Sequence, residues 1–569
     1  MKPQSYQGPP SIAKALFMGE IHPDAVFPFP AVPESEQQRI DTLVKAGRDF
    51  LAANYDARQV EAQGRIGEDI FRGLGEIGLL GLYLPEEYGG QGLSQTAYCQ
   101  VFEQLTAFDP TLSVVMGVHQ SIGMKPIYLF GTDAQKERFL PDLAAGHRLA
   151  GFALTEPNAG SDAYHIESRA AAQADGSYVL NGEKRYIGNG SKDVLITFAR
   201  DDDGEHLALI VEQGMDGFEV GEAYDTMGLR ANDLRHLYFR DVRVPPENVL
   251  SEVGEGFNIA VETLNSGRLS LGTGSVGAVK MLRDMAVEHT LSRHQFGQPL
   301  ADFELVEAKI AWMEMMHYGY HAMAYLIAGL VDAGMPDYAV ETAMVKVAGT
   351  ELLWYAANRA FQLAGGKAYL RDEPYEKILR DIRVFPIFEG ANDVMRMFVA
   401  LTGLEPLGDE LRELAGFGYR EPLKTLGGWT DYLGGRVSRV LAPGDFPWVD
   451  PDFEGDANTA ARQVAHLRRK SESLLREHGE NIQSQQHQLK RLAEAAADIF
   501  AQIATLSRIS TTIQEDETGD HEHEARLAKV FCRRAADRVS HYFDLIDSND
   551  DSQIHSIASH VYDLHQKGG

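Results

Sequence analysis

The sequence predicts a largely helical protein with a β domain inserted between helical domains. At 569 residues the chain is too long for one hydrophobic core, so two to four domains are expected. Apolar residues recur every three or four positions in 34–56 and 66–80, and again from about 255 to 405, as they do in amphipathic helices. Between about 150 and 250 the pattern changes to short strand-like runs separated by Gly and Asp turns. This order of patterns predicts the inserted β domain.

The β domain is predicted from several runs of β-branched and aromatic residues. The segment YVLNGEKRYI carries Asn181-Gly182 between two strand-like halves, which predicts a β-hairpin over 178–187. Three further strands are expected at 194–200, 207–213 and 236–245.

The last third of the chain extends beyond these helices. Gly, Pro and Trp concentrate in 415–450, which predicts a linker or Ω-like segment. Long amphipathic helices are expected over 457–513 and 521–567. We therefore expect four domains: an N-terminal helical domain (1–150), a middle β domain (151–255), a C-terminal helical bundle (256–405), and a linker with a helical extension (406–569).

The composition indicates which ligands and which cellular compartment are expected for the protein. The 53 basic and 83 acidic residues give a net charge of −30, which argues against nucleic acid as a ligand. The two cysteines, Cys99 and Cys532, cannot form a disulfide framework, which favours a reducing compartment. Neither a membrane-spanning apolar run nor a signal-like N-terminus is seen, so we expect a cytoplasmic protein, with possible peripheral membrane contact through 415–443.

Three patterns that suggest other sites are better explained structurally. The run from Gly272 to Gly277 fits G-x-G-x-x-G, but a predicted helix (257–271) precedes it where a dinucleotide site needs a strand. We interpret its small residues as allowing close helix packing. The run from His521 to Glu524 lacks the HExxH spacing, and His119 is taken as a structural histidine. No metal site is expected.

The candidate catalytic residue is Glu389, between Phe388 and Gly390 and just ahead of a helix start at Asn392-Asp393. Apolar neighbours would desolvate this carboxyl, and desolvation raises a carboxyl pKa toward the working pH of a general base. Gly390 lets the backbone approach a ligand closely. A solvated loop glutamate is the alternative for this residue taken alone.

The run RDIRVFPIFEGANDVMRMFVAL, residues 380–401, resembles the catalytic segment of the acyl-CoA dehydrogenases. The likeness covers nearly the whole chain, and with its C-terminal extension the chain is most similar to the very-long-chain branch of that family. This resemblance implies a helical N-terminal domain, a β-barrel-like middle domain and a C-terminal four-helix bundle. It also implies that Glu389 is the base that removes the substrate α-proton.

The resemblance implies an FAD site in the middle domain. The stretch FALTEPNAGSDA (152–163) matches the Thr-Glu-Pro-x-x-Gly-Ser-Asp motif of the family. By this match Phe152, Leu154 and Thr155 lie against the flavin, and Ser161 sits where FAD and the CoA end of the substrate meet.

Other cofactor positions depart from the family pattern. Tyr186 stands where relatives carry Trp, and Gly188 and Ala391 stand where relatives carry a hydroxyl residue. The run MGLRANDL has likewise lost the hydroxyls at 232 and 234. The resemblance still assigns Tyr186, Gly188, Ala391 and Asp393 to the cofactor, with weaker hold on the flavin expected.

Three further segments resemble the family in the same order. SRHQFG and FQLAGGKAY imply that Arg293, Phe296, Gln362, Gly365 and Gly366 reach the FAD of a neighbouring subunit. The run LNSGR implies that Asn265 and Arg268 line the substrate pocket. Together with Ser161, Phe388 and Gly390, these two residues form the implied substrate site.

The function implied by the resemblance is the first step of fatty acid β-oxidation. A homodimer would convert a long-chain acyl-CoA to the trans-2-enoyl-CoA, with FAD accepting the β-hydride and an electron-transferring flavoprotein accepting the electrons. Two alternatives remain open: an acyl-CoA oxidase that passes electrons to oxygen, and a catalytically weak scaffold relative that has lost flavin-site hydroxyls.

Overall fold

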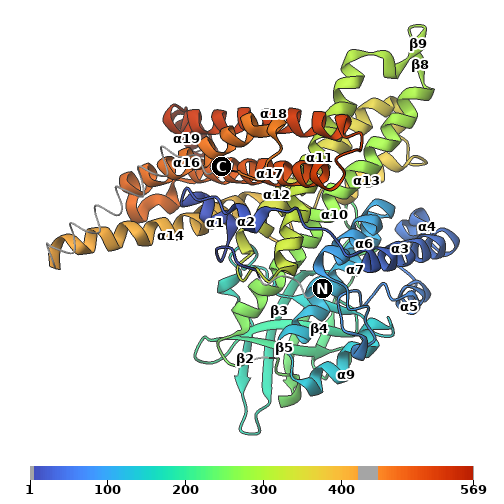
Figure 1. Ribbon diagram of the computed structural model, residues 1–569. Coiled ribbons are helices and arrows are strands. Elements are labelled where there is room, and N and C mark those ends of the chain that lie inside the picture. Colours follow the sequence, from blue (N-terminus) through green and yellow to red (C-terminus); the bar gives the residue numbers. More distant parts are fainter. Residues whose placement is uncertain (1–5, 251, 421–445, 568–569) are drawn as a thin grey trace. The chain divides into compact units, whose positions relative to one another are not determined.

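A computed structural model describes residues 6–250, 252–420 and 446–567 (Figure 1). The chain folds into two compact units. Unit 1 holds residues 30–334 and 345–392, and unit 2 holds residues 6–29, 335–344 and the chain from 393 onward. The order of helices, β sheet, helices and helical extension confirms the predicted fold class. No helix in the described part of the chain is both long and apolar enough to cross a membrane.

Unit 1 begins with a helical region that packs around a π-helical segment, Val118–Met124. Ser94 caps α6 by accepting from the Ala97 backbone N–H at 3.1 Å. The region comprises α3 (Glu34–Asn54), α4 (Ala57–Gln63), α5 (Glu68–Ile77), α6 (Gln95–Phe108), α7 (Pro110–Gly117), α8 (Lys125–Phe130) and α9 (Asp133–Ala144).

His119 in the π-helical segment is a structural histidine, as predicted. Its ring is fully buried, the Ala150 N–H donates to Nδ1 at 3.0 Å, and Nε2 lies 3.1 Å from the Leu143 carbonyl. Burial lowers its pKa to about 4, so the ring is neutral and Nε2 carries the proton that it donates. His119 thus ties the helical region to the first strand.

The middle of unit 1 is a seven-stranded sheet of order β1-β4-β2-β3-β7-β6, with β5 paired to β4. Alternate residues of β4 face two separate cores: Ile196 packs with residues of the helices, whereas Leu195 packs among the strands. This two-sided burial explains the continuous apolar run in β4. The strands are β1 (Ala150–Ala153), β2 (Arg169–Ala172), β3 (Tyr178–Ile187), β4 (Val194–Arg200), β5 (His206–Glu212), β6 (Phe218–Val220) and β7 (Arg235–Val244).

The hairpin predicted at Asn181-Gly182 is wrong. Residues Tyr178–Ile187 form one strand, β3, that pairs antiparallel with β7 and shifts register between Leu180 and Gly182. Asn181 exchanges hydrogen bonds with Asp241 of β7, at 3.0 and 2.9 Å, in place of turning the chain. Gly182 fits because a Cβ there would collide with Ser168. The Asn-Gly pair therefore marks a β-bulge.

After the sheet, unit 1 continues with α10 (Gly256–Ser292), the small hairpin β8–β9 (294–299), α11 (Glu304–Asp332), the main part of α12 (Ala339–Ala364) and α13 (Pro374–Ile382). The G-x-G-x-x-G run lies inside α10, as expected for helix packing. A Cβ on Gly272 would lie 2.8 Å from the Val345 carbonyl oxygen, and a Cβ on Gly274 would lie 2.6 Å from Thr106 Oγ1. These glycines let α12 and α6 approach α10 closely.

Unit 2 contains the helical extension. The predicted long helices are present, broken at Gly479, which has a φ of +53°, and at residues 548–550. The unit's helices are α1 (Ile12–Phe17), α2 (Pro23–Val26), α14 (Asn392–Arg420, whose first residue belongs to unit 1), α16 (Glu454–His478), α17 (Gln486–Glu515), α18 (Glu522–Asp547) and α19 (Asp551–Lys567).

Helix α14 runs past residue 405, where we expected the helical bundle to end. Helix α14 continues to Arg420 with Pro406 inside it, so the first residues of the expected 415–450 linker are helical. Glycines weaken a helix by only about 1 kcal/mol each, which an extended helix can absorb. Residues 421–445 of that linker, and with them most of the expected membrane contact, lie outside the described residues.

Candidate active site

The centre of the site is the loop between α13 and α14, which holds Glu389. Glu389 has a φ of +57°, a left-handed conformation that is uncommon for a residue with a side chain, and Gly390 follows at +93°. The Asn392 N–H donates to the Pro386 carbonyl at 2.9 Å and closes the loop. A strained glutamate held by a closed loop points to a positioned side chain rather than a solvated one.

Two buried cations fix the loop through its carbonyl oxygens. Arg268 of α10 donates from Nε to the Glu389 carbonyl at 3.2 Å, and Lys346 of α12 donates from Nζ to the Gly390 carbonyl at 2.7 Å. Lys346 is 0% exposed and also donates to Asn392 Oδ1 at 2.8 Å. Asn265, expected in the substrate pocket, accepts from Arg268 Nη1 at 3.1 Å and orients that guanidinium. The loop is therefore held from two helices.

One oxygen of the Glu389 carboxylate makes no compensating hydrogen bond within the described residues. Its Oε2 is buried, with no hydrogen-bond partner in the described part of the chain. A Cβ on Gly267 would lie 2.9 Å from this oxygen. Glycine at this position therefore leaves the space that the Glu389 carboxylate occupies. Burial raises the pKa of Glu389 to about 7, against the opposing charges of Arg268 and Lys346. This is the range that suits a general base near neutral pH.

Glu389 stands at one wall of a pocket in unit 1. Four hydroxyl groups line it, yet each donates to a carbonyl three or four residues earlier in its own helical segment. The bonds are Thr106 to Phe102 (3.0 Å), Ser113 to Pro110 (3.0 Å), Ser121 to Gly117 (2.7 Å) and Ser270 to Ser266 (2.9 Å).

Because the four hydroxyl groups donate to backbone carbonyls, the pocket presents a mainly apolar surface to a ligand. Its other lining residues are Phe102, Val114, Gly117, Val118, Gly267, Leu271, Phe385 and Phe388. The arrangement can hold a hydrocarbon chain beside a carboxylate base.

The Thr155 turn of the sheet is held by a buried ion pair that the sequence did not reveal. Glu156 Oε1 lies 2.6 Å from Lys184 Nζ, and the Ser168 N–H donates to the same oxygen at 3.0 Å. Burial alone would raise the pKa of Glu156, but the Lys184 ammonium and the hydrogen bonds lower it below its ordinary value. The Arg185 N–H donates to the Thr155 carbonyl at 2.8 Å. Both sides of the turn are thus fixed.

Two residues expected at the flavin lie at the end of β3 and in the turn that follows it. Tyr186 is 54% exposed and has a φ of +61°, so its ring projects from a strained backbone. Gly188 is partly buried, and a Cβ there would lie 3.3 Å from both amide atoms of Asn232. Asn232 Oδ1 is buried and makes no hydrogen bond within the described chain. Asn232 is one of the positions that lost the family hydroxyl, and it brings a polar amide beside Gly188.

The structure links this face of the sheet to the Glu389 pocket. Phe152 and Leu154 are buried in one core cluster with Ile122. The Cγ2 atom of Ile122 lies 3.0 Å from the place where a Cβ on Gly267 would stand, beside the Glu389 carboxylate. Ser161 is exposed on the neighbouring loop.

The remaining expected cofactor residues lie at the other end of α10. Arg293 follows Arg268 by about 37 Å along the helix axis, and Phe296 is 95% exposed with a φ of +55°. Lys367, beside Gly366, is close enough to Glu288 and His289 for their charges to interact. We call these five exposed residues the distal group: Arg293, Phe296, Gln362, Gly365 and Gly366.

Two further expected residues lie in the Glu389 loop and directly after it. Ala391 lies within it, and Asp393 is exposed in the first turn of α14, where its side chain accepts from Arg396 Nη1 at 3.4 Å. The sequence missed Lys346, Gly267, Glu156 and Lys184. Only Lys346 carried a usable signal, a lone cation within the apolar run AMVKVAG.

Four family models match the chain in series. They are described as "Acyl-CoA dehydrogenase, N-terminal domain" (residues 35–147), "Acyl-CoA dehydrogenase, middle domain" (151–242), "Acyl-CoA dehydrogenase, C-terminal domain" (254–404) and "ACAD9/ACADV, C-terminal domain" (451–567).

Individual proteins are similar over almost the whole chain. The mitochondrial very long-chain specific acyl-CoA dehydrogenase of Homo sapiens is 36% identical over 545 residues, which cover 93% of this chain and 83% of that protein. The probable acyl-CoA dehydrogenase FadE10 of Mycobacterium tuberculosis is 31% identical over 576 residues, covering 95% and 87%. Among solved structures, the acyl-CoA dehydrogenase complexed with FAD from Bacillus anthracis has a TM-score of 0.81 at 28% identity, covering 96% and 94%.

Proposed function

This chain belongs to the acyl-CoA dehydrogenase family, and from that premise we propose that it oxidises a long-chain fatty acyl-CoA to the trans-2-enoyl-CoA with FAD as oxidant. The observation that carries the proposal is the Glu389 carboxyl, buried at an apolar pocket with a pKa raised to about 7. The length of the acyl chain is proposed from the similarity to the very long-chain relative.

Glu389 removes the α-proton of the bound thioester. Its pKa makes the carboxylate available near neutral pH and a stronger base than a solvated glutamate. Gly267 leaves room for Oε2, while Arg268 and Lys346 hold the loop so that the carboxylate stays in place. The pocket walls exclude water and bind the acyl chain, which orients the reacting carbon atoms against the base.

The residues of the sheet face fit a flavin. The fixed Thr155 turn, the exposed ring of Tyr186 and the partnerless amide oxygen of Asn232 offer a polar edge and an aromatic cover. When bound, FAD supplies the two-electron oxidation that Glu389 cannot supply. We propose an electron-transferring flavoprotein as the electron acceptor.

The distal group on α10 belongs, in this proposal, to the FAD of a second copy. About 37 Å of helix separates Arg293 from Arg268. This distance is too long for both residues of one chain to contact the same flavin ring system. Phe296 is also exposed on a left-handed backbone, as expected for a residue that contacts another molecule. A homodimer would complete two sites by exchanging these groups.

An anaerobic titration tests the proposed reaction. Purified protein should contain about one FAD per chain, and a series of acyl-CoAs should bleach the flavin absorbance, most completely with long chains. Oxygen uptake during turnover would instead identify an oxidase. Stoichiometric FAD without bleaching by any acyl-CoA, or protein without FAD, would favour the scaffold alternative.

A single substitution tests the exchange between copies. Arg293→Ala removes a cation that can pair with phosphate, so FAD content should fall while the circular dichroism of the chain is unchanged. Arg240→Ala, an exposed arginine of β7, serves as the control and should keep its FAD. Full FAD occupancy in the Arg293 variant, or in a demonstrably monomeric parent, would contradict the exchange.

A further inference from the structure

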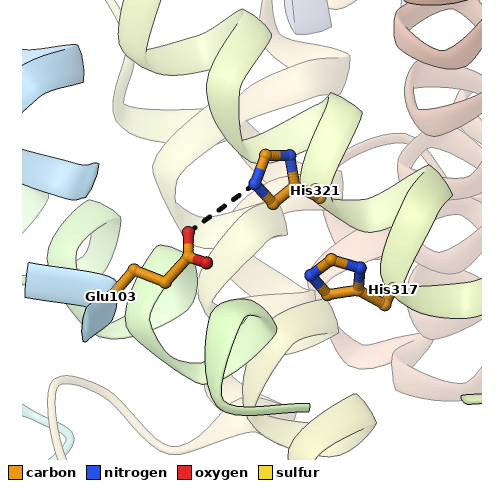
Figure 2. A group of neighbouring side chains, drawn as sticks. All are labelled: Glu103, His317 and His321. Atoms are coloured by element: carbon orange, nitrogen blue, oxygen red, sulfur yellow. Dashed lines mark ion pairs between the residues drawn. The ribbon is translucent and has the colours of Figure 1, made fainter. Parts of the chain in front are cut away.

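Three metal-ligating side chains converge inside unit 1, away from the Glu389 loop (Figure 2). His317 and His321 come from α11 and Glu103 comes from α6. The two histidines are four residues apart, so they share one face of the helix, and their ring centroids are 5.2 Å apart. The Glu103 Oε2 atom lies 3.6 Å from His321 Nε2. One ligand atom from each of the three residues lies within 4.8 Å of the others.

The position of Glu103 is specified by its surroundings. The residue is only 8% exposed, and burying a carboxylate is costly unless a cation or a metal ion compensates it. Opposite it, α10 carries Gly277, where a Cβ would overlap the Glu103 side chain. The helix thus leaves a space that this carboxylate fills.

An outer group orients the ligands. Tyr325, one turn beyond His321 on α11, donates from its hydroxyl to Glu103 Oε2 at 2.8 Å. The Tyr325 ring also stacks on His321 with centroids 4.2 Å apart, which limits how that imidazole can turn. Metal sites commonly hold their ligands through such second contacts.

We propose that Glu103, His317 and His321 bind one divalent transition metal ion, with zinc the best match. Two imidazoles and a carboxylate suit zinc, cobalt, nickel or copper, whereas magnesium and calcium prefer oxygen ligands alone. Ligands of a tetrahedral zinc ion lie about 3.3 Å from one another, since each zinc bond is about 2.0–2.1 Å long. The ligand atoms lie within 4.8 Å of one another, so each pair needs to close by about 1.5 Å at most, and a fourth position stays open to water.

The ion would join α6 to α11 beside the acyl pocket. Phe102 and Thr106, on either side of Glu103 in α6, both line that pocket. A metal bond between the two helices would therefore stabilise the pocket wall. Metal uptake itself does not depend on the proposed dehydrogenase activity, so each can fail without the other.

The alternative is an ion pair in which a protonated histidine compensates Glu103 without any metal. Metal analysis of the FAD-loaded, full-length protein separates the two. The protein is dialysed against a chelator, equilibrated with zinc chloride at micromolar free zinc, and analysed by mass spectrometry for zinc per chain. Cobalt chloride in a parallel sample reports the ligand geometry through its visible absorption.

The parent should bind one zinc per chain and unfold at a higher temperature with zinc than without it. His317→Gln and His321→Gln should each weaken zinc binding at least tenfold and lose the thermal shift. His555→Gln, which removes an exposed histidine of α19, is the matched control and should behave as the parent. Glu103→Gln is a third ligand variant, and if its buried amide prevents folding, the two histidine variants still decide.

Two results would overturn the proposal. One is a parent that takes up less than a tenth of an equivalent of zinc. The other is zinc binding that survives in both histidine variants, which would place the metal at surface groups. Circular dichroism and FAD content of each variant show that a lost site is not a lost fold.

Discussion

Two buried glutamates have the same raised pKa and different surroundings. Burial raises the pKa of Glu389 in unit 1 to about 7, and it raises the pKa of Glu341 in unit 2 to about 7 as well. Glu341 is 0% exposed, and its Oε1 accepts from Ser11 Oγ at 2.7 Å and from the Ala13 N–H at 2.8 Å. Its carboxyl binds the first turn of α1. The carboxyl of Glu389 instead lines a pocket.

The difference shows that a shifted pKa does not identify a catalytic residue by itself. Desolvation acts on both carboxyls alike, but only Glu389 combines it with a pocket, a left-handed backbone and two cations that hold its loop. Glu341 has the raised pKa of a base, but its carboxyl accepts hydrogen bonds from Ser11 and Ala13. The predictions below separate these two roles.

The largest effect is expected from Glu389→Gln. The amide is nearly isosteric and cannot accept a proton, so flavin reduction by acyl-CoA should fall by several orders of magnitude while FAD and acyl-CoA still bind. Glu341→Gln is the matched control and should reduce at a rate within about twofold of the parent. Anaerobic stopped-flow absorbance measures both. A Glu389 variant that retains a tenth of the parent rate would show that another residue is the base.

A smaller loss is expected from Gly267→Ala, which leaves every charge in place. The added methyl would lie 2.9 Å from Glu389 Oε2 and 3.0 Å from Ile122 Cγ2, so the carboxylate must move. A displacement approaching 1 Å can cost about 100-fold in rate. Stopped-flow reduction should therefore slow by about 10- to 100-fold, with FAD content unchanged. A parent-like rate would mean that the position of Oε2 is not critical.

The pH dependence should separate the two glutamates. Glu389 acts as a base only when ionised, so the rate of flavin reduction should rise about tenfold per pH unit below pH 7 and level off above it. Folding responds in the opposite sense. Because the pKa of Glu341 in the folded chain lies above its ordinary value of 4.5, folding loses stability as pH rises from about 4.5 to 7.

Glu341→Gln should remove that loss, which is on the order of 3 kcal/mol at most. Its melting temperature should exceed that of the parent at pH 8 and match it near pH 4, while the rate profile keeps its midpoint. If the midpoint of the rate profile shifts in this variant, the kinetic pKa belongs to Glu341 and not to Glu389.

The sequence predicted those parts of the site that lie in one continuous motif. The apolar and glycine neighbours of Glu389 left a solvated loop glutamate as an alternative, and the resemblance of the whole run 380–401 assigned it as the base. The predicted helix before the G-x-G-x-x-G run excluded a dinucleotide site there. Lys346 and the Glu156–Lys184 pair were missed because each acts on residues distant in sequence. Their partners are fixed only by tertiary packing.

The errors in secondary structure have the same cause. Asn181-Gly182 has the local preference of a hairpin, but the pairing of Asn181 with Asp241 on β7 makes it a bulge. The concentration of Gly, Pro and Trp predicted a linker from residue 415, although the backbone remains helical to Arg420. Local propensity was overridden in both places by the rest of the fold.

The smallest effect is expected from a double variant, which tests whether the Glu389 region binds a cofactor and the Glu341 region does not. The double variant Gly188→Thr with Ala391→Thr restores two hydroxyls, each worth about 0.5–1.5 kcal/mol if it bonds the flavin. Gly188 does not adopt a positive φ, so threonine fits its backbone, but its Cβ would lie 3.3 Å from the Asn232 amide, which must shift by a few tenths of an ångström.

That shift should consume part of the gain. FAD retention during dilution should therefore improve only about two- to fivefold, with turnover unchanged. Asn232→Ala should have the opposite effect, because it removes the amide oxygen that we propose as part of the polar edge for the flavin. Glu341→Gln should leave FAD retention as it is. If the double variant instead gains acyl-CoA activity that the parent lacks, the parent is a degenerate relative and Glu389, like Glu341, is a buried glutamate without a reaction.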